Sequence, residues 1–337
     1  MHPAEALDQI ATLLERGLAP TYKVQAFRRA ADSIRDRSID DLRKLSKSGR
    51  LRSLSGVGTS TSRVIAEVLE GKTPDYLTNL EAEAAPDAGP GGEIRTALRG
   101  DLHSHSDWSD GGATIEQMAT AARDLGHDYL ALTDHSPSLK VARGLTADRL
   151  RKQLDVVARL NGELAPFRIL TGAEIDILED GSLDQDEELL AELDVVVASV
   201  HSKLRMPEQP MTDRMVAAMA NPHSDILGHC TGRMVRGRGR PESTFDPDLV
   251  FGACAHFDKA VEINCRPERL DPPMRLLEQV VTWGCKVSID SDAHAMGQLE
   301  WQPYGCARAA EAGVPVERIV NTWKAGDLLA WTGTHAE

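Results

Sequence analysis

Apolar positions in the first 80 residues recur with the period of an α-helix. They fall at Leu7, Ile10, Leu13 and Leu14, and again at Val24, Phe27, Ala30, Ala31 and Ile34. Spacings of three and four residues put these side chains on one helical face. Short breaks occur near residues 17–20 and 48–49. The pattern predicts a small all-helical domain over residues 1–81.

From residue 98 the pattern changes to short apolar runs separated by amphipathic helical stretches such as residues 115–125, 147–160 and 274–283. Strands alternating with helices indicate a parallel sheet, and seven of them suit a closed or nearly closed βα barrel. The expected strands are residues 98–102, 129–133, 168–171, 194–200, 225–227, 260–263 and 286–289. Between the two parts, residues 82–97 are rich in Ala, Pro and Gly and predict a linker.

Histidine, aspartate and glutamate residues recur at the ends of the predicted strands. Residues that end or follow a strand include His103, His105, Asp110, His135, Glu174, His201, His229, Asp292 and His294. In a βα barrel these ends share one face, where active sites are built. A single His or Asp there would be an ordinary capping or hydrogen-bonded group, but the joint phasing favours a shared site. The other histidines, His127 among them, are expected on the surface or on helices.

Mixed histidine and carboxylate ligands without cysteine suit Zn²⁺, Mn²⁺ or Fe²⁺. Nine candidate ligands are too many for one ion and indicate a cluster of metals. Clusters of this kind commonly hydrolyse phosphate esters, because the ions activate water and hold the phosphoryl oxygens. The strands are followed by none of the glycine motifs that bind nucleotides.

The net charge of −14 argues against a nucleic-acid partner, but the charge is uneven. Residues 1–80 hold 13 Lys and Arg against 10 Asp and Glu, whereas residues 81–337 hold 25 against 42. The five cysteines show no CxxC spacing, no apolar run is long enough to span a membrane, and the first residues do not resemble a secretory signal. We therefore expect a cytoplasmic protein with reduced thiols and no membrane partner.

A glycine turn stands out in the helical part, at Gly56-Val57-Gly58 before an apolar helix. Such a turn leaves backbone N–H groups free at a helix start, where a phosphate oxygen can bind. The alternative is an ordinary turn between two helices.

The run from KVQAFRRAADSIR through this turn to EVLEGKTPDYLTNLE resembles the small N-terminal domain of family X DNA polymerases. The resemblance implies a helix-hairpin-helix domain that binds DNA backbone without reading sequence, through Gly56, Val57, Gly58, Thr59 and Arg63. Val64 stands where eukaryotic members carry a lyase lysine, so we expect no lyase chemistry.

The rest of the chain is similar to the polymerase and histidinol phosphatase (PHP) family of metal-dependent phosphoesterases. HSHSDWSDG, LTDHS and SDAH carry this likeness, and TGAEIDILEDGSLD, VVVASVHSKL and VEINCRPERLD place it closest to the PHP domain of bacterial family X polymerases. The family implies a distorted seven-stranded, TIM-like (β/α)7 barrel over residues 98–337 with three divalent ions. His103, His105, Glu174 and Asp292 would hold the first ion, Glu174 would bridge to a second held by His201 and His229, and Asp110, His135 and His294 would hold the third.

Basic residues beyond these strands are candidates to neutralise a phosphate. Arg233 and Arg269 are the leading ones, and with Glu174 and Asp292 they form the expected catalytic set. Arg236, Arg238, Arg240 and Arg266 lie in the same loops and Lys203 follows His201, with Lys140 and Arg143 as weaker candidates.

Three functions remain open at this point. The leading hypothesis is an enzyme of DNA repair that acts on DNA ends as a 3′–5′ exonuclease, a 3′-phosphatase or an abasic-site nuclease, with a metal-bound hydroxide attacking phosphorus. The linker leaves no room for a polymerase palm domain, so we expect no DNA synthesis. A small-molecule phosphomonoesterase of the histidinol-phosphatase type is the alternative, and a non-catalytic DNA-binding accessory protein is the third. Oligomeric state and metal identity stay open.

Overall fold

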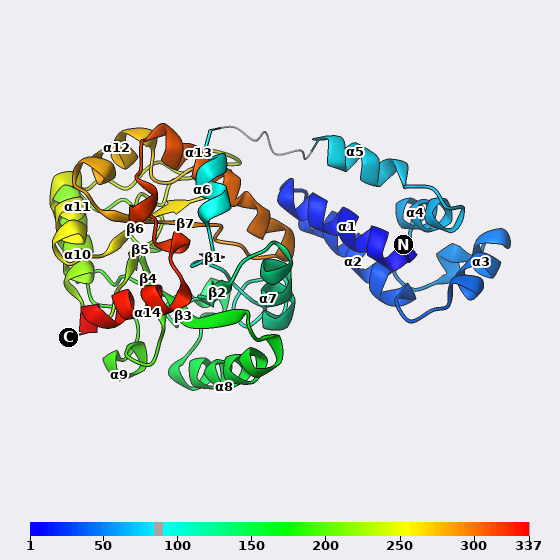
Figure 1. Ribbon diagram of the computed structural model, residues 1–337, viewed down its shortest axis with the longest axis horizontal. Coiled ribbons are helices and arrows are strands. Elements are labelled where there is room, and N and C mark those ends of the chain that lie inside the picture. Colours follow the sequence, from blue (N-terminus) through cyan, green and yellow to red (C-terminus); the bar gives the residue numbers. More distant parts are fainter. Residues whose placement is uncertain (84–89, 337) are drawn as a thin grey trace. The chain divides into compact units, whose positions relative to one another are not determined.

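The chain is divided into two compact units, Met1–Asp87 and Ala88–Glu337, in a computed structural model that describes residues 1–83 and 90–336 (Figure 1). The first unit is entirely helical among its described residues. The second contains a sheet of seven parallel strands. No helix in the described ranges is long and apolar enough to cross a membrane.

Amphipathic helices build the first unit around one apolar core. Its helices are α1 (Pro3–Arg16), α2 (Thr21–Ile34), α3 (Ile39–Lys47), α4 (Thr59–Leu69) and α5 (Asp75–Glu83), with a short 3₁₀ turn, η1, at Leu51–Ser53. The periodic positions of the sequence are the ones that are buried, including Leu7, Ile10, Phe27 and Ile34. Helix α1 begins with a capping box, in which His2 and Glu5 satisfy backbone N–H groups that the helix itself leaves free.

The seven strands of the second unit are paired in chain order, each parallel to the next. They are β1 (Gly100–Asp101), β2 (Tyr129–Leu132), β3 (Arg168–Asp176), β4 (Val195–Ser199), β5 (Ile226–Leu227), β6 (Ala260–Asn264) and β7 (Lys286–Asp290). Nearly every strand residue is buried, as is typical of a parallel sheet covered by helices. The predicted seven-stranded barrel is therefore confirmed.

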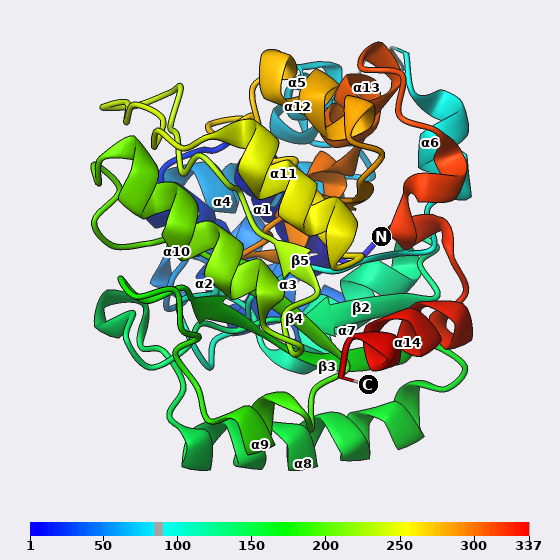
Figure 2. The ribbon, with the colours of Figure 1, turned by 90° about the vertical axis from the view of Figure 1, so that its left-hand side faces the viewer.

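Helices surround the strands of this unit on the outside (Figure 2). They are α6 (Gly92–Ala97), α7 (Ile115–Asp124), α8 (Ala147–Leu164), α9 (Glu187–Leu190), α10 (Glu208–Ala220), α11 (Pro247–His256), α12 (Met274–Thr282), α13 (Gln302–Glu311) and α14 (Ala325–Gly333). Leu328 and Trp331 of α14 share a buried cluster with strand residues such as Tyr129 and Val195. The strand residues of this apolar cluster come before the carboxyl ends of the strands, where the polar residues lie.

Side chains close the barrel between its first and last strands. The Asn321 side chain accepts a hydrogen bond from Ile289 N at 2.7 Å and donates to the carbonyl oxygen of Gly100 at 3.3 Å. The amide of Gln302 donates to the same Gly100 oxygen and to Ile289 O, both at 3.0 Å. Farther along the chain, His105 N donates to Ala293 O at 2.8 Å. Buried amides thus help to hold the seam, because they satisfy backbone groups that a strand pair would otherwise satisfy.

The structure differs from the sequence prediction at several boundaries. β1 has two residues and β3 continues five residues beyond Thr171. The predicted linker also differs, because residues 92–97 form α6, which packs on α13 and buries Ile94. Residues 84–89 of that linker lie outside the described ranges. His127 differs as well, since it is buried.

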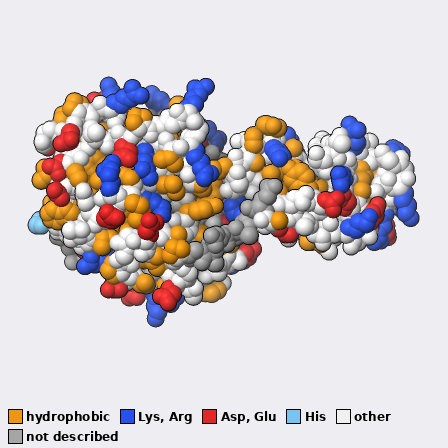
Figure 3. Space-filling model, turned by 90° about the horizontal axis from the view of Figure 1, so that it is seen from above, with side chains coloured by type: hydrophobic (Ala, Val, Ile, Leu, Met, Phe, Trp, Pro, Cys, Tyr) orange, Lys and Arg blue, Asp and Glu red, His pale blue; other side chains and the backbone are white. Residues whose placement is uncertain are grey.

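The surface of the molecule carries no single dominant charge in the view of Figure 3. Basic, acidic and apolar side chains alternate there. The acidic excess of the second unit is therefore not displayed as one continuous patch on this face. Part of that excess lies inside the barrel, at the buried carboxylates described next.

Candidate active site

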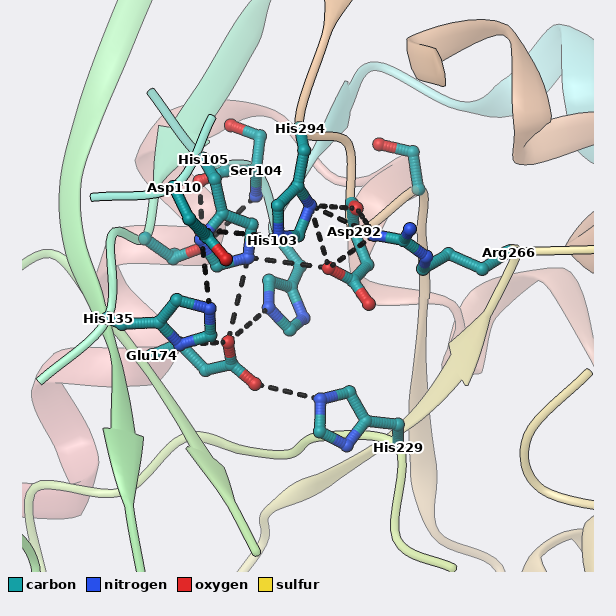
Figure 4. Close-up of polar contacts among 12 residues, drawn as sticks. His103, Ser104, His105, Asp110, His135, Glu174, His229, Arg266, Asp292 and His294 are labelled. Carbon is teal, nitrogen blue, oxygen red and sulfur yellow. Dashed lines mark hydrogen bonds and ion pairs between the residues drawn. The ribbon is translucent and has the colours of Figure 1, made fainter. Parts of the chain in front are cut away.

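All nine predicted metal ligands converge at the carboxyl ends of the barrel strands, and Figure 4 labels eight of them. Six histidines and three carboxylates come from segments that are nearly 200 residues apart in the chain. The site is buried at its base, where His103, His105, Glu174 and Asp292 are at most 2% exposed. Such a concentration of ionisable side chains has no packing function and marks a binding centre.

Glu174 is the centre of the arrangement. One carboxylate oxygen, Oε2, lies 2.9 Å from His135 Nδ1 and 3.3 Å from His103 Nε2. The other, Oε1, lies 2.8 Å from His229 Nε2 and 3.2 Å from His201 Nε2. A carboxylate with histidine nitrogens around both oxygens is placed to bridge two cations. This agrees with the bridging role that the family resemblance implied for it.

A second group of ligands surrounds Asp110. Its Oδ1 lies 3.4 Å from His294 Nε2 and 3.6 Å from His135 Nε2. Asp292 Oδ1 lies 3.4 Å from His105 Nε2. Asp292 has a φ of 51°, a left-handed conformation that is uncommon outside glycine. Residues held in this conformation often have a functional role, and here the turn directs the carboxylate into the site.

The ligand atoms fall into three overlapping groups in which all atoms lie within 4.8 Å of one another. The groups are His105, Asp110, His135 and His294; His103, His105 and Glu174; and His135, Glu174 and His201. The second lies within the set predicted for the first ion, and the first adds His105 to the set predicted for the third. His105 and His135 each belong to two groups, so the assignment of ligands to individual ions remains a prediction.

The chemistry of the donor atoms fits divalent cations. His103 Nε2, His105 Nε2, His135 Nδ1 and Glu174 Oε1 are buried inside the cluster and have no hydrogen-bond partner. Buried polar atoms without partners are rare in folded proteins, because they lose their hydration without compensation. Ions coordinated by these atoms would supply the missing interactions.

Electrostatics in the site also favour cations. Burial opposes ionisation of Glu174, but the charges of His201, His103 and His135 hold its pKa well below its usual range. Burial likewise lowers the pKa of His229 to about 4, with help from Arg269, so its imidazole is neutral and can act as a ligand. His201 differs, because Glu174 and Asp176 outweigh burial and raise its pKa to about 9. The proton on His201 thus occupies a ring nitrogen that a metal ion would bind instead.

Two carboxylates that the sequence did not single out as partners orient the histidines. Glu262 lies 2.7 Å from His103 Nδ1 and also accepts a hydrogen bond from His229 N. Asp176 lies 3.0 Å from His201 Nδ1. A carboxylate on the far nitrogen of a metal-binding histidine fixes its orientation and tautomer. The available signal was a charged residue inside an apolar strand, as in Ala260-Val-Glu-Ile-Asn264.

The loop that contains His103 and His105 is fixed by Asp134. Its carboxylate accepts hydrogen bonds from Ser106 N at 2.8 Å and from Gln153 Nε2 at 2.6 Å. Asp107 is exposed and belongs to none of the three ligand groups described above. Trp108 packs against the cluster formed by α7 and α8, which makes it a packing residue.

The candidate arginines occupy different positions. Arg269 lines the pocket, with Nε 3.3 Å from Asp292 Oδ2. Arg266, a secondary candidate, also lines it and donates to Asp292 O at 3.0 Å. Arg233 does not line the pocket: its guanidinium donates to Arg269 O at 3.0 Å, to Leu270 O, and to Glu242 at 3.3 Å. The structure therefore gives Arg233 a role in holding its loop, in contrast to the phosphate contact expected from sequence.

The pocket itself has a volume of about 350 Å³. Six of the nine predicted ligands form its floor, and its walls add Arg266 and Arg269. Leu139, Val141, Ala142 and Met234 complete the lining near the mouth. A small anionic group with one apolar substituent fits such a composition.

In the first unit, the predicted turn of Gly56, Val57 and Gly58 lies between η1 and α4, and Thr59 and Arg63 lie in α4. Gly56 has a φ of 75°, and a Cβ there would come within 3.1 Å of Arg29 O. Val57 is buried in the unit's core, so only its backbone could face a ligand. Gly58 is the N-cap of α4 and Thr59 is exposed beside it. Arg63 is exposed but is paired with Glu67 at 2.7 Å and Asp75 at 2.9 Å. Val64, at the lyase position, is a core residue.

The fold and this site define a metal-dependent phosphoesterase barrel. Residues 101–264 match the PHP domain family, and residues 1–74 match a helix-hairpin-helix domain family. The chain is thus a PHP phosphoesterase with an N-terminal helix-hairpin-helix domain, of the kind found in family X polymerases. It is 40% identical over 234 residues to the DNA polymerase/3′-5′ exonuclease PolX of Bacillus subtilis (strain 168), which covers 69% of this chain. The chain spans 41% of the length of that relative.

Other similar proteins are phosphatases by name. A probable phosphatase of Thermoanaerobacter sp. (strain X514) is 28% identical over 234 residues, covering 66% of this chain and 89% of that protein. The structure of histidinol phosphate phosphatase from Lactococcus lactis subsp. lactis Il1403, complexed with zinc, L-histidinol and phosphate, is 18% identical with a TM-score of 0.45. It covers 64% of this chain and 94% of its own.

Proposed function

We propose that this protein hydrolyses phosphoester bonds at the 3′ ends of DNA during repair. The observation that carries the proposal is the combination, in one chain, of a complete histidine and carboxylate centre with a helix-hairpin-helix domain. The Bacillus relative, which is named a 3′-5′ exonuclease, supports the choice of DNA. Tethering a DNA-binding unit to a hydrolytic one raises the local concentration of DNA ends near the site.

Three divalent ions, Zn²⁺, Mn²⁺ or Fe²⁺, are proposed for the centre. The residues that would hold them are His103, His105, Asp110, His135, Glu174, His201, His229, Asp292 and His294. When bound, such ions supply an activated water and neutralise phosphoryl oxygens. The buried base keeps bulk solvent away from these groups, which strengthens every electrostatic interaction in the site.

The role of the protein's own groups follows from their positions. Glu174 and Asp292 provide the buried negative charge that retains cations at the floor. Arg269 has a buried Nη1 atom without a hydrogen-bond partner, so it has a donor available for a phosphoryl oxygen. A guanidinium prearranged where negative charge develops stabilises the transition state without reorganising at that moment. Arg266 fixes the Asp292 turn, through Asp292 O, and contacts His294 Nδ1 at 2.9 Å.

The decisive experiment is product analysis on labelled DNA with 3′-hydroxyl, 3′-phosphate and abasic ends, in Mn²⁺, Zn²⁺ and Mg²⁺. We expect removal of nucleotides or terminal phosphates, and loss of activity in the Asp292→Ala protein. A purified protein that leaves all three DNAs intact and hydrolyses a small phosphomonoester well would contradict the proposal.

A small-molecule phosphomonoesterase is the second candidate. The probable phosphatases that resemble this chain over most of their own length support it. That function requires the barrel and its site but has no need of residues 1–81. Comparing catalytic efficiency on histidinol phosphate with that on DNA in the experiment above separates the two functions.

A further inference from the structure

Two rims border the mouth of the active-site pocket. One is a hairpin, Met234–Arg240, in which Met234 and Arg240 exchange two backbone hydrogen bonds of 2.9 Å and Met234 lines the pocket. The other is the 3₁₀ turn η2 (Lys140–Ala142) with the preceding Leu139. Neither rim carries a predicted metal ligand, so the chemistry described above does not account for them.

The base of the hairpin is firmly anchored. Arg233 donates to two backbone carbonyls of the segment after β6, and Arg240 Nε donates to Gly232 O at 2.5 Å. Val235 N donates to Glu268 O at 2.6 Å. These bonds fix where the hairpin projects, although its far end makes few contacts of its own.

The end of the hairpin carries charge that the fold does not use. Arg236 and Arg238 are exposed, and neither has an acidic partner within the described ranges. Gly237 and Gly239 have φ values of 72° and 69°, so the turn that displays these side chains needs glycine. Unpaired arginines at the mouth are unusual in a part of the chain where 42 acidic residues outnumber 25 basic ones. Their charge is available to an anionic ligand.

The other rim is mainly apolar, and Val141 is its exposed apolar residue. Val141 is 92% exposed although it lines the pocket, and Lys140 beside it is exposed without an acidic partner in the described chain. The rim is supported from below by Arg149, which donates to Arg143 O at 2.6 Å. An exposed valine next to a catalytic pocket contributes nothing to folding, but it offers a surface for a sugar or a base.

We propose that these two rims clamp a single polynucleotide strand as its end enters the pocket. Arg236 and Arg238 contact the backbone phosphates next to the scissile one, and Val141 contacts a sugar or base. A pocket of about 350 Å³ is at the small end of ligand sites, so the neighbouring nucleotides of a strand must lie over its rims. The inference rests on the proposed function and refines its substrate to a strand of several nucleotides.

The test compares the full-length Arg236→Gln/Arg238→Gln protein with wild type in Mn²⁺. Substrates are a series of single-stranded di-, tetra- and octanucleotides and a chromogenic nitrophenyl phosphate ester. For the octanucleotide we expect KM to rise about tenfold, and the slope of log KM against log salt concentration to fall by about 1.4 for two lost phosphate contacts. In wild type KM falls as the strand lengthens, and in the variant this trend disappears. Kinetics on the chromogenic ester remain unchanged.

The matched control is Arg123→Gln/Arg151→Gln, which removes the same charge from exposed positions on α7 and α8 and should leave all substrates unaffected. An octanucleotide KM that is the same in the hairpin variant and in wild type would overturn the clamp alone. A wild-type protein that hydrolyses the ester but none of the oligonucleotides would overturn the proposed function and the clamp with it.

Discussion

At the scale of single residues, Arg233 and Arg269 have different surroundings, although the sequence predicted a phosphate contact for both. Arg269 reaches Asp292 in the pocket, whereas Arg233 holds backbone carbonyls and Glu242. A loop sequence does not determine which way a long side chain points, because that direction depends on partners distant in the chain. The consequence is that two similar substitutions should have different effects.

We expect Arg269→Gln to lower kcat by about 100-fold with the thermal midpoint unchanged, because it removes a donor from the site. Arg233→Gln should instead lower stability by about 1–3 kcal/mol, because it leaves backbone acceptors without partners. Steady-state kinetics with thermal unfolding of both proteins checks this. Equal losses of kcat without loss of stability would contradict the structural role of Arg233.

Glu262 offers a prediction about metal affinity. Because it contacts His103 Nδ1 and His229 N, we expect Glu262→Gln to weaken metal binding by about 10–100-fold while every direct ligand is retained. Titration of the metal-free protein followed by calorimetry measures this. Glu278→Gln, an exposed change on α12, is the control. Unchanged affinity in Glu262→Gln would show that the contact does not orient the ligands.

The positions of the candidate ligands could be read from the sequence, but their grouping could not. Each candidate follows a strand or, like Glu174, lies near a strand's end, so its position is a local property of the chain. The sharing of His105 and His135 between groups depends on distances across the barrel, which no local pattern contains. The sequence did not identify Glu262 as a positioning residue, because it lies within β6 and its two histidine partners are far away in the chain.

At the scale of elements, the barrel seam shows what the apolar pattern cannot specify. All seven strands were predicted from apolar runs, but β1 is only two residues long. Asn321 and Gln302 complete the closure from segments far along the chain. The sequence also did not predict helix α6, because the Pro and Gly residues before it indicate a linker. A helix of six residues is not stable by itself, and α6 is stabilised by its packing on α13.

Asn321→Ala should destabilise the second unit by about 2–4 kcal/mol, because the backbone of Ile289 and the Asp290 carboxylate lose buried partners. Urea unfolding followed by tryptophan fluorescence measures the loss. Gln209→Ala, on the exposed side of α10, provides the comparison. A midpoint like that of the comparison protein would mean that the seam does not depend on Asn321.

His127, just before β2, makes stability depend on pH. Burial, helped by the charge of Arg95, lowers its pKa to about 4. The folded-state pKa is below the unfolded value, so protonation favours unfolding, and its stabilising effect is complete above pH 6.5 and declines toward pH 4. Between pH 7.5 and 5, wild type should lose about 2 kcal/mol more than His127→Gln. Equal pH slopes in the two proteins would contradict this.

At the scale of the whole molecule, the two units support different parts of the proposed function. The barrel and its ligands lead to phosphoester hydrolysis without help from the first unit. The choice of DNA depends on that unit, and therefore on whether the turn before α4 receives phosphate. The first-turn N–H groups of a helix have no partners within the helix, and Gly58, at the N-cap position of α4, has no side chain that could satisfy them.

A change at Gly58 separates DNA binding from folding. Gly58 has an extended backbone and open space where a Cβ would lie. Aspartate and asparagine are both favourable at such a cap, so neither variant should unfold. Only the aspartate carries a negative charge that would oppose a phosphate, and we expect Gly58→Asp to bind DNA about tenfold more weakly than Gly58→Asn. Fluorescence anisotropy with labelled DNA measures this, with activity on a small ester unchanged in both. Equal affinities would remove the turn from the DNA-binding surface and weaken the case for a DNA substrate.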